Sequence, residues 1–198
     1  MTAAFNLHDL DIKKFAQDGA QAAGTLNLAD FARACEDLPA ETAHPLPAVQ
    51  WQAQGLWRNV LGQSVPYSTS EVMGQPWLRL HIHTEVARHC QRCLQTLVLP
   101  VAVDRLFRFV PDEATASAQD EDSAEDVLVW DKHFDLHALL EDEILLDLPL
   151  IPMHAHCPLL AAQPCRFKDL AQFRHAGKDG ADLHEGQIGF IRQKPRDG

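Results

Sequence analysis

The stretch from Asp135 to Cys157 reads DLHALLEDEILLDLPLIPMHAHC and predicts a helix that leads into a proline-rich segment. Its apolar residues recur at helical spacing and define one packing face, made of Leu136, Leu139, Leu140 and Ile144. Asp135 is a favourable N-cap residue at the positive end of the helix dipole. Pro149 and Pro152 end the helix, because proline donates no amide hydrogen bond and restricts the residue before it.

Three consecutive acidic residues interrupt the apolar pattern of this helix, namely Glu141, Asp142 and Glu143. Successive helical residues diverge by about 100°, so the three carboxylates do not converge as a catalytic acid–base pair would. We therefore expect a central helix with a buried apolar face and a solvated acidic outer side, which is either plain surface or a docking surface.

The region before this helix has the period of β-structure. Three segments either alternate apolar and polar residues or contain an extended apolar run, and a fourth, short segment of this kind follows an acidic stretch. The expected strands are 49–57, 77–86, 97–110 and 126–130. Pro100 indicates an edge position, a bulge or a break between two strands. Consecutive strands without intervening helices favour an antiparallel sheet. The predicted fold class is α+β, with a sheet of about four to six strands that is open or curled into a partial barrel.

The remaining parts of the chain suggest one domain with appendages. Residues 1–48 contain two short helical patterns joined by glycine, the second capped by Asn27. Residues 111–126 carry many acids and no Lys or Arg, so we expect a mobile acidic loop there. We expect a single domain over residues 1–165, followed by an irregular, flexible C-terminal tail over 166–198.

Composition and charge narrow the class of protein. The chain has 198 residues, a formal net charge of −11 and an estimated pI near 5.3. Nucleic-acid affinity depends on basic groups that contact phosphates, so this charge disfavours tight direct binding to RNA and gives no indication of DNA binding. No apolar run is long enough to span a bilayer, and no secretory signal is visible, so no membrane association is expected. Five cysteines, an odd number, indicate reduced thiols or a metal in a cytoplasmic protein.

The cysteines contain one constellation with metal-ligand spacing. Cys90 and Cys93 form a Cys-x-x-Cys pair, which supplies two zinc ligands from one turn. Cys157 is the candidate third ligand, and the fourth is either Cys165 or His154. The alternative is a set of reduced, partly buried thiols without a metal. Two other features have simpler explanations: Cys35 is expected to be a packed thiol, and the pair His81 and His83 is expected on an ordinary exposed strand face.

The order of these motifs resembles the YceD family, whose members are known as large ribosomal RNA subunit accumulation proteins. The resemblance covers roughly residues 5–165 and rests on the ordered set CQRCL (90–94), an acidic stretch, DL (135–136), LEDEILL (140–146), LP (148–149), PMH (152–154) and Cys157. It implies a non-enzymatic bacterial factor needed for the synthesis, processing or stability of large-subunit 23S ribosomal RNA. Related sequences carry more cysteines in this region, which supports structural zinc.

The acidic charge then favours a basic protein partner, such as a ribosomal protein or a ribosome-maturation factor, over bare RNA. The competing hypothesis is a zinc-dependent hydrolase, which needs an open coordination position and a nearby general base. The sequence contains no phosphate-binding glycine loop, nucleophile elbow, zinc-protease motif or dinucleotide fingerprint, so it offers no catalytic residues.

Overall fold

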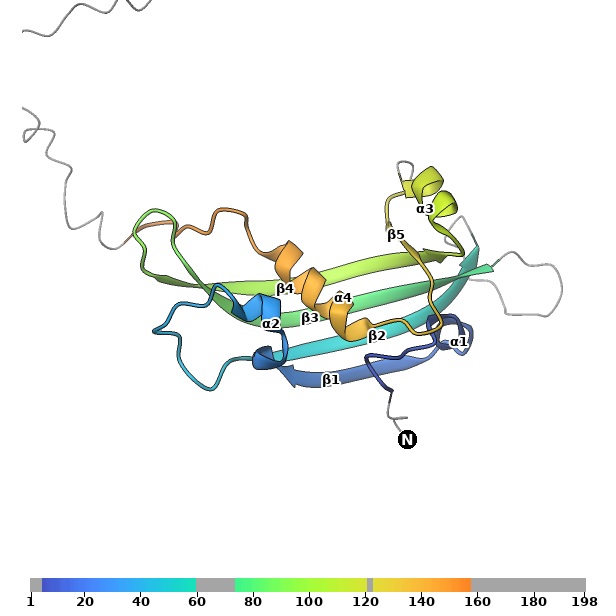
Figure 1. The fold of residues 1–198 in the computed structure, drawn as a ribbon, viewed down its shortest axis with the longest axis horizontal. Helices are drawn as coiled ribbons and strands as arrows, with labels where there is room; N and C mark the ends of the chain where they lie inside the picture. The colour runs from blue at the N-terminus through green and yellow to red at the C-terminus, as the bar shows by residue number, and fades with distance from the viewer. Residues whose placement is uncertain (1–4, 60–73, 121–122, 158–198) are drawn as a thin grey trace, which may run out of the picture. The chain divides into compact units, whose positions relative to one another are not determined.

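The protein forms an open five-stranded sheet in the computed structural model, which describes residues 5–59, 74–120 and 123–157 (Figure 1). The strands lie in sequence order, and their bounds are β1 Gln21–Asn27, β2 Ala48–Asn59, β3 Gly74–His89, β4 Thr96–Val110 and β5 Asp126–Val129. Strands β1 to β4 pair antiparallel, whereas β5 runs parallel to β4. The predicted α+β class with an antiparallel sheet is confirmed. The sheet does not close, so the partial barrel does not form.

Short helices and one longer helix accompany the sheet: α1 Ile12–Gln17, the 3-10 turn η1 Leu28–Asp30, α2 Ala32–Cys35, α3 Glu113–Asp120 and α4 Leu136–Asp147. Helix α4 crosses one face of the sheet obliquely, and α2 lies beside it (Figure 1). Asp135 caps α4 as expected, because its carboxylate accepts a hydrogen bond from Ala138 N at 2.9 Å. Within the described ranges, no helix is long and apolar enough to cross a membrane.

The hydrophobic core lies between α4 and the face of the sheet that it covers. Leu136, Leu140 and Ile144 are fully buried, which confirms most of the predicted packing face, while Leu139 is half-buried. They share one core cluster with side chains from three strands, including Val49, Leu78, Leu80, Val103, Phe107 and Phe109. Each fully buried Leu or Ile contributes roughly 1.5–3 kcal/mol of transfer free energy, so α4 and the sheet stabilise each other. The opposite face is polar and includes Gln50, Gln52, His81, His83 and Asp104.

The free edge of β4 is protected by proline and by the end of α4. Strand β4 pairs with β5 only over residues 107–110, so its earlier part has one open edge. Ala102 N points to that edge and donates to Asp147 Oδ2 at 3.0 Å. Pro100 lies two residues before Ala102 in the same strand, so its backbone nitrogen, which carries no hydrogen, also faces this edge. Of the three alternatives for Pro100, the edge position is therefore confirmed.

The two short helical segments predicted in residues 1–48 are present as α1 and as η1 with α2, but a strand, and not a glycine hinge, joins them. Asn27 does cap a helical turn, since its side chain accepts from Ala29 N at 2.9 Å. Residues 21–27, however, form β1, which the sequence analysis missed because Gln, Ala and Gly are poor strand formers. Of these residues only Ala22 is buried, so β1 depends on its backbone pairing with β2. Gly55 permits this arrangement, because a Cβ there would clash with the carbonyl of Phe15.

The acidic segment also differs from the prediction of a loop at 111–126. Residues 113–120 form helix α3, whose first turn is capped by Asp112 through a 2.8 Å bond from Thr115 N. Alanine-rich composition and an acidic residue, Glu113, in the first turn favour the helix. Residues 121–122 lie outside the described part, as does the expected tail at 166–198.

The expectation that the acidic residues of α4 are all solvated is wrong for two of them. Glu141 is only 8% exposed and Glu143 only 4%. Glu143 follows Leu136 by seven residues and Leu140 by three, so it lies on the packing face; this spacing could have been recognised in the sequence. Asp142 is half-exposed and pairs with Arg33 at 2.7 Å.

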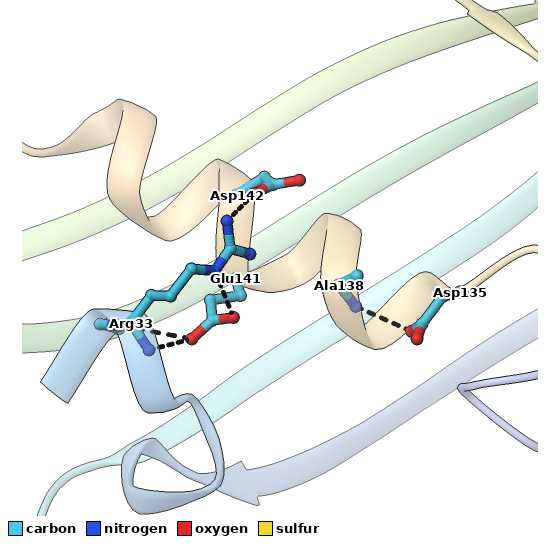
Figure 2. Close-up of polar contacts among 6 residues, drawn as sticks. Arg33, Asp135, Ala138, Glu141 and Asp142 are labelled. Atoms are coloured by element: carbon cyan, nitrogen blue, oxygen red, sulfur yellow. Dashed lines mark hydrogen bonds and ion pairs between the residues drawn. The ribbon is translucent and has the colours of Figure 1, made fainter. Parts of the chain in front are cut away.

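The two buried carboxylates have opposite electrostatic environments. Glu141 accepts hydrogen bonds from Arg33 N at 2.7 Å, from Arg33 Nε at 2.9 Å and from Ala34 N at 3.3 Å, which joins α4 to the start of α2 (Figure 2). Burial alone would raise its pKa, but these donors lower the pKa below its ordinary value. Burial raises the pKa of Glu143, whose Oε2 lies 3.4 Å from Arg105 Nε without a hydrogen bond.

Substitution of each glutamate by glutamine should therefore change stability in opposite directions. The lowered pKa of Glu141 gives stability that is present above its unfolded pKa and is lost as pH falls. Glu141→Gln should cost about 1–2 kcal/mol at pH 7, and this cost should disappear in acid. The raised pKa of Glu143 means that its ionised form costs stability at neutral pH, so Glu143→Gln should stabilise the fold there.

Urea unfolding of the two variants at pH 7 and at a series of acid pH values that extends below the lowered pKa of Glu141 measures both effects. A loss of stability at pH 7 in Glu143→Gln would mean that its pairing with Arg105 outweighs the cost of burial.

Candidate metal centre

The Cys-x-x-Cys pair lies in the turn that joins β3 to β4. Cys90 follows directly after β3, and its N–H donates to Gln95 O at 2.9 Å. Leu94 N donates back to Cys90 O at 2.8 Å, and Leu94 adopts a left-handed conformation with φ 60°. These bonds close a tight turn of the kind that allows two cysteines three residues apart to face the same point.

The segment after α4 is bound to this turn through the backbone. Gln91 N donates to Pro152 O at 2.8 Å, and His154 N lies 3.4 Å from Cys90 Sγ as a donor to that sulfur. The prolines that end α4 thus carry the chain back to the end of the β3–β4 hairpin. This contact places His154 and Cys157 against Cys90 and Cys93.

Four potential ligand atoms converge at this point. The ligand atoms of Cys90, Cys93, His154 and Cys157 all lie within 4.8 Å of one another. Cys90 Sγ is 3.7 Å from Cys157 Sγ, and Cys93 Sγ is 3.5 Å from His154 Nδ1. Ligands about 2.3 Å from a tetrahedral zinc ion are about 3.8 Å apart, so these separations fit a zinc site.

Burial and hydrogen bonding prepare one thiol for metal binding. Cys90 and Cys157 are buried, whereas Cys93 and His154 are half-buried. Burial opposes ionisation of Cys90, but backbone N–H groups of His154, Arg92 and Cys93 lower its pKa to about 5. Burial and hydrogen bonding to the neighbouring sulfurs raise the pKa of Cys157 to about 11. The cluster therefore favours a thiolate at Cys90 that accepts a hydrogen bond from the thiol of Cys157. A divalent cation bound by both sulfurs would displace the thiol proton of Cys157.

The predicted site residues can now be placed. The structure brings together Cys90, Cys93, Cys157 and His154, a set that could hold a metal such as zinc. Cys165, the alternative fourth ligand, lies outside the described residues. Cys35 is half-buried and its thiol donates to Leu28 O at 3.2 Å.

Two histidine groups lie elsewhere. His81 pairs with Asp104 at 3.3 Å on the polar face of the sheet, where His83 also lies. The sequence analysis missed a second cluster of ligand-type side chains, formed by His8, Asp135 and His137. Residue 8 is far from residues 135 and 137 in the chain, so no local spacing reveals this group.

The fold and this cluster define an α+β protein whose four-residue candidate metal centre joins the end of a sheet to the segment after its central helix. A family model described as "Large ribosomal RNA subunit accumulation protein YceD" matches residues 78–179, slightly more than half of the chain. The chain therefore belongs to the YceD family, as its motif order suggested. The matched region includes most of β3, all of β4 and α4, and all four clustered ligands. No curated protein and no solved structure matches the chain.

Removal of one clustered ligand should reveal whether a metal supports the fold. Cys93→Ser should lower the zinc content of the purified, tag-free protein and reduce the free energy of unfolding by about 3 kcal/mol. This is the linkage expected when free zinc is a few hundred times its dissociation constant. Chelators should remove the metal more readily as pH falls, because protons then compete with the metal for the cysteine thiolates.

Cys35→Ser is the matched control, since Cys35 lies outside the cluster and serine retains a donor for Leu28 O. Elemental analysis and urea unfolding measure both quantities. If the wild type carries no stoichiometric metal and Cys93→Ser unfolds like the wild type, the cysteines are packing residues.

Proposed function

We propose that this protein is a non-enzymatic factor for the accumulation of large-subunit ribosomal RNA, and that a structural zinc ion stabilises its fold. The observation that carries this proposal is the match to the YceD family, which covers the central helix and the candidate metal centre together. The family description names accumulation of the RNA and no reaction.

The ligand set supports a structural zinc ion over a catalytic one. Catalytic zinc keeps a coordination position open for water or substrate, whereas structural zinc is surrounded by four protein ligands. The cluster supplies four side chains, and two of them, Cys90 and Cys157, are buried. The competing hypothesis of a zinc-dependent hydrolase is therefore less consistent with this centre.

The structural ion would join parts of the chain that are distant in sequence. Cys90 and Cys93 lie at the end of the β3–β4 hairpin, and His154 and Cys157 lie beyond α4. A link between them closes a long loop, and because the ion binds only where the fold brings these four side chains together, its binding free energy adds to the free energy of folding. The ion would thereby strengthen the contact between the segment after α4 and the β3–β4 turn, where Gln91 N already donates to Pro152 O.

A basic protein, either a ribosomal protein or a ribosome-maturation factor, is the partner that the charge favours. The net charge of −11 repels the phosphates of RNA and attracts basic surfaces. The burial of Glu141 and Glu143 removes both from any docking surface, so the acids that remain available to a partner lie elsewhere.

Depletion of the protein in its host should lower the amount of large-subunit RNA relative to small-subunit RNA. Re-expression of the wild type should restore the ratio, and re-expression of Cys93→Ser should restore it less well in proportion to its loss of folded protein. Quantitative RNA analysis during slow and fast growth measures this ratio. An unchanged ratio in both conditions contradicts the proposed function.

A tagged form of the chain should retain its partner after nuclease treatment and lose it as the salt concentration rises, because opposite charges at exposed surfaces are screened by salt. Mass spectrometry and RNA sequencing of the same purified fraction distinguish protein from RNA partners. If the purified fraction contains nuclease-resistant ribosomal RNA and no basic protein, the proposed type of partner is contradicted.

A further inference from the structure

The N-terminal segment and the start of α4 present three metal-ligating side chains to one another. The ligand atoms of His8, Asp135 and His137 lie within 4.8 Å of one another. His8 Nδ1 is 3.2 Å from Asp135 Oδ2, and the rings of His8 and His137 have centroids 4.7 Å apart. This group is separate from the cysteine cluster and contains only nitrogen and oxygen donors.

Backbone hydrogen bonds hold the two segments in place. Leu7 O accepts from Leu136 N at 2.7 Å and from His137 N at 3.2 Å. Leu10 and Phe134 form an antiparallel bridge with two hydrogen bonds, of 2.9 and 3.1 Å. His8 lies between these two contacts, so its position relative to α4 is determined by the fold and not by its own exposed side chain.

Asp135 and His137 are oriented so that one carboxylate oxygen of Asp135 and the ring nitrogens of His137 are available to bind a metal. Oδ1 of Asp135 caps α4 through Ala138 N, as Figure 2 shows, and Oδ2 remains directed at His8. The ring of His137 stacks on Phe31, with centroids 4.5 Å apart and an interplanar angle of 11°. In the part of the chain that the structure describes, neither ring nitrogen of His137 has a hydrogen-bond partner. The stack on Phe31 fixes the plane of the ring, and both ring nitrogens remain available as ligand atoms.

We propose that His8, Asp135 and His137 form a binding site for a divalent transition-metal ion of the zinc, nickel or cobalt type. Two imidazoles and one carboxylate suit these ions, whereas calcium and magnesium prefer oxygen ligands. The three side chains leave further coordination positions to water, since each of them is at least partly exposed. The bound ion would fasten the segment before α1 to the first turn of α4.

The local charge is compatible with a cation in spite of the helix dipole. The start of α4 carries a partial positive charge, which disfavours a cation, but the Asp135 carboxylate offsets it. The pair of Asp9 Oδ1 and His133 Nδ1, 2.6 Å apart, lies on the same two bridged segments. His133 takes no part in the proposed site, so it provides a control of the same residue type.

Calorimetric titration of the full chain with Ni²⁺ tests this proposal, with Co²⁺ absorption as a second probe. The wild type should show a binding step that Asp135→Asn and His137→Gln each weaken at least tenfold. Asparagine is also a good N-cap residue, so Asp135→Asn removes the charged ligand while it retains the cap of α4. Thiolate-specific absorption of Co²⁺, which reports on the cysteine cluster, should remain unchanged in both variants.

The control variant His133→Gln should bind like the wild type. Amide hydrogen exchange supplies a second readout: added Ni²⁺ should slow exchange at residues 7–10 in the wild type and not in Asp135→Asn. Isotherms that are identical for the wild type and Asp135→Asn would overturn the proposal, as would a wild type that shows no binding step outside the cysteine cluster.

Discussion

The burial of α4 against one face of the sheet is the contact on which the other features depend. An antiparallel sheet with one apolar face must cover that face, and here the fully buried residues Leu136, Leu140 and Ile144 contribute to the cover. The direction of α4 across the sheet places its start beside the N-terminal segment and its end at the free edge of β4. The group of His8, Asp135 and His137 lies at the start of α4, and the cysteine cluster lies at the β3–β4 turn, which the chain reaches after the end of α4.

Charged side chains reinforce this packing unequally. Glu141 joins α4 to α2 through three hydrogen-bond donors, so its charge is well compensated at a nearly buried position. Glu143 faces the sheet with Arg105 nearby and no hydrogen bond to its Oε2 within the described residues. Buried ion pairs of poor geometry seldom repay their desolvation, so the second glutamate is a weak point of the interface. The LEDE sequence of this helix thus serves mainly to position it, and it contributes only Asp142 to the surface.

The cysteine cluster has a different role, because it lies where the hydrophobic contact ends. Beyond Asp147 the chain contains exposed apolar residues, among them Leu150 and Ile151, which contribute little to the core. Hydrogen bonds from Gln91 N to Pro152 O and from His154 N to Cys90 Sγ hold this segment to the β3–β4 turn, and a metal bound by the cluster would add to that constraint. The region that the family model matches contains both this helix and the four clustered ligands.

The sequence by itself determined the local features, and only the tertiary structure decided which distant groups meet. Strand periodicity located β2, β3 and β4, and Asp135 and the prolines bounded α4. The Cys-x-x-Cys spacing identified half of the candidate metal centre. Each of these features depends on neighbours in the chain. The edge strand β1 was missed, since its stability comes from pairing with β2 and not from its own residues. The burial of Glu141 depends on its hydrogen bonds with Arg33. The position of His154 in the cysteine cluster depends on the hydrogen bond from Gln91 to Pro152, and the position of His8 depends on the bridge between Leu10 and Phe134. These contacts join residues far apart in sequence, and such contacts have no period or spacing from which they can be read.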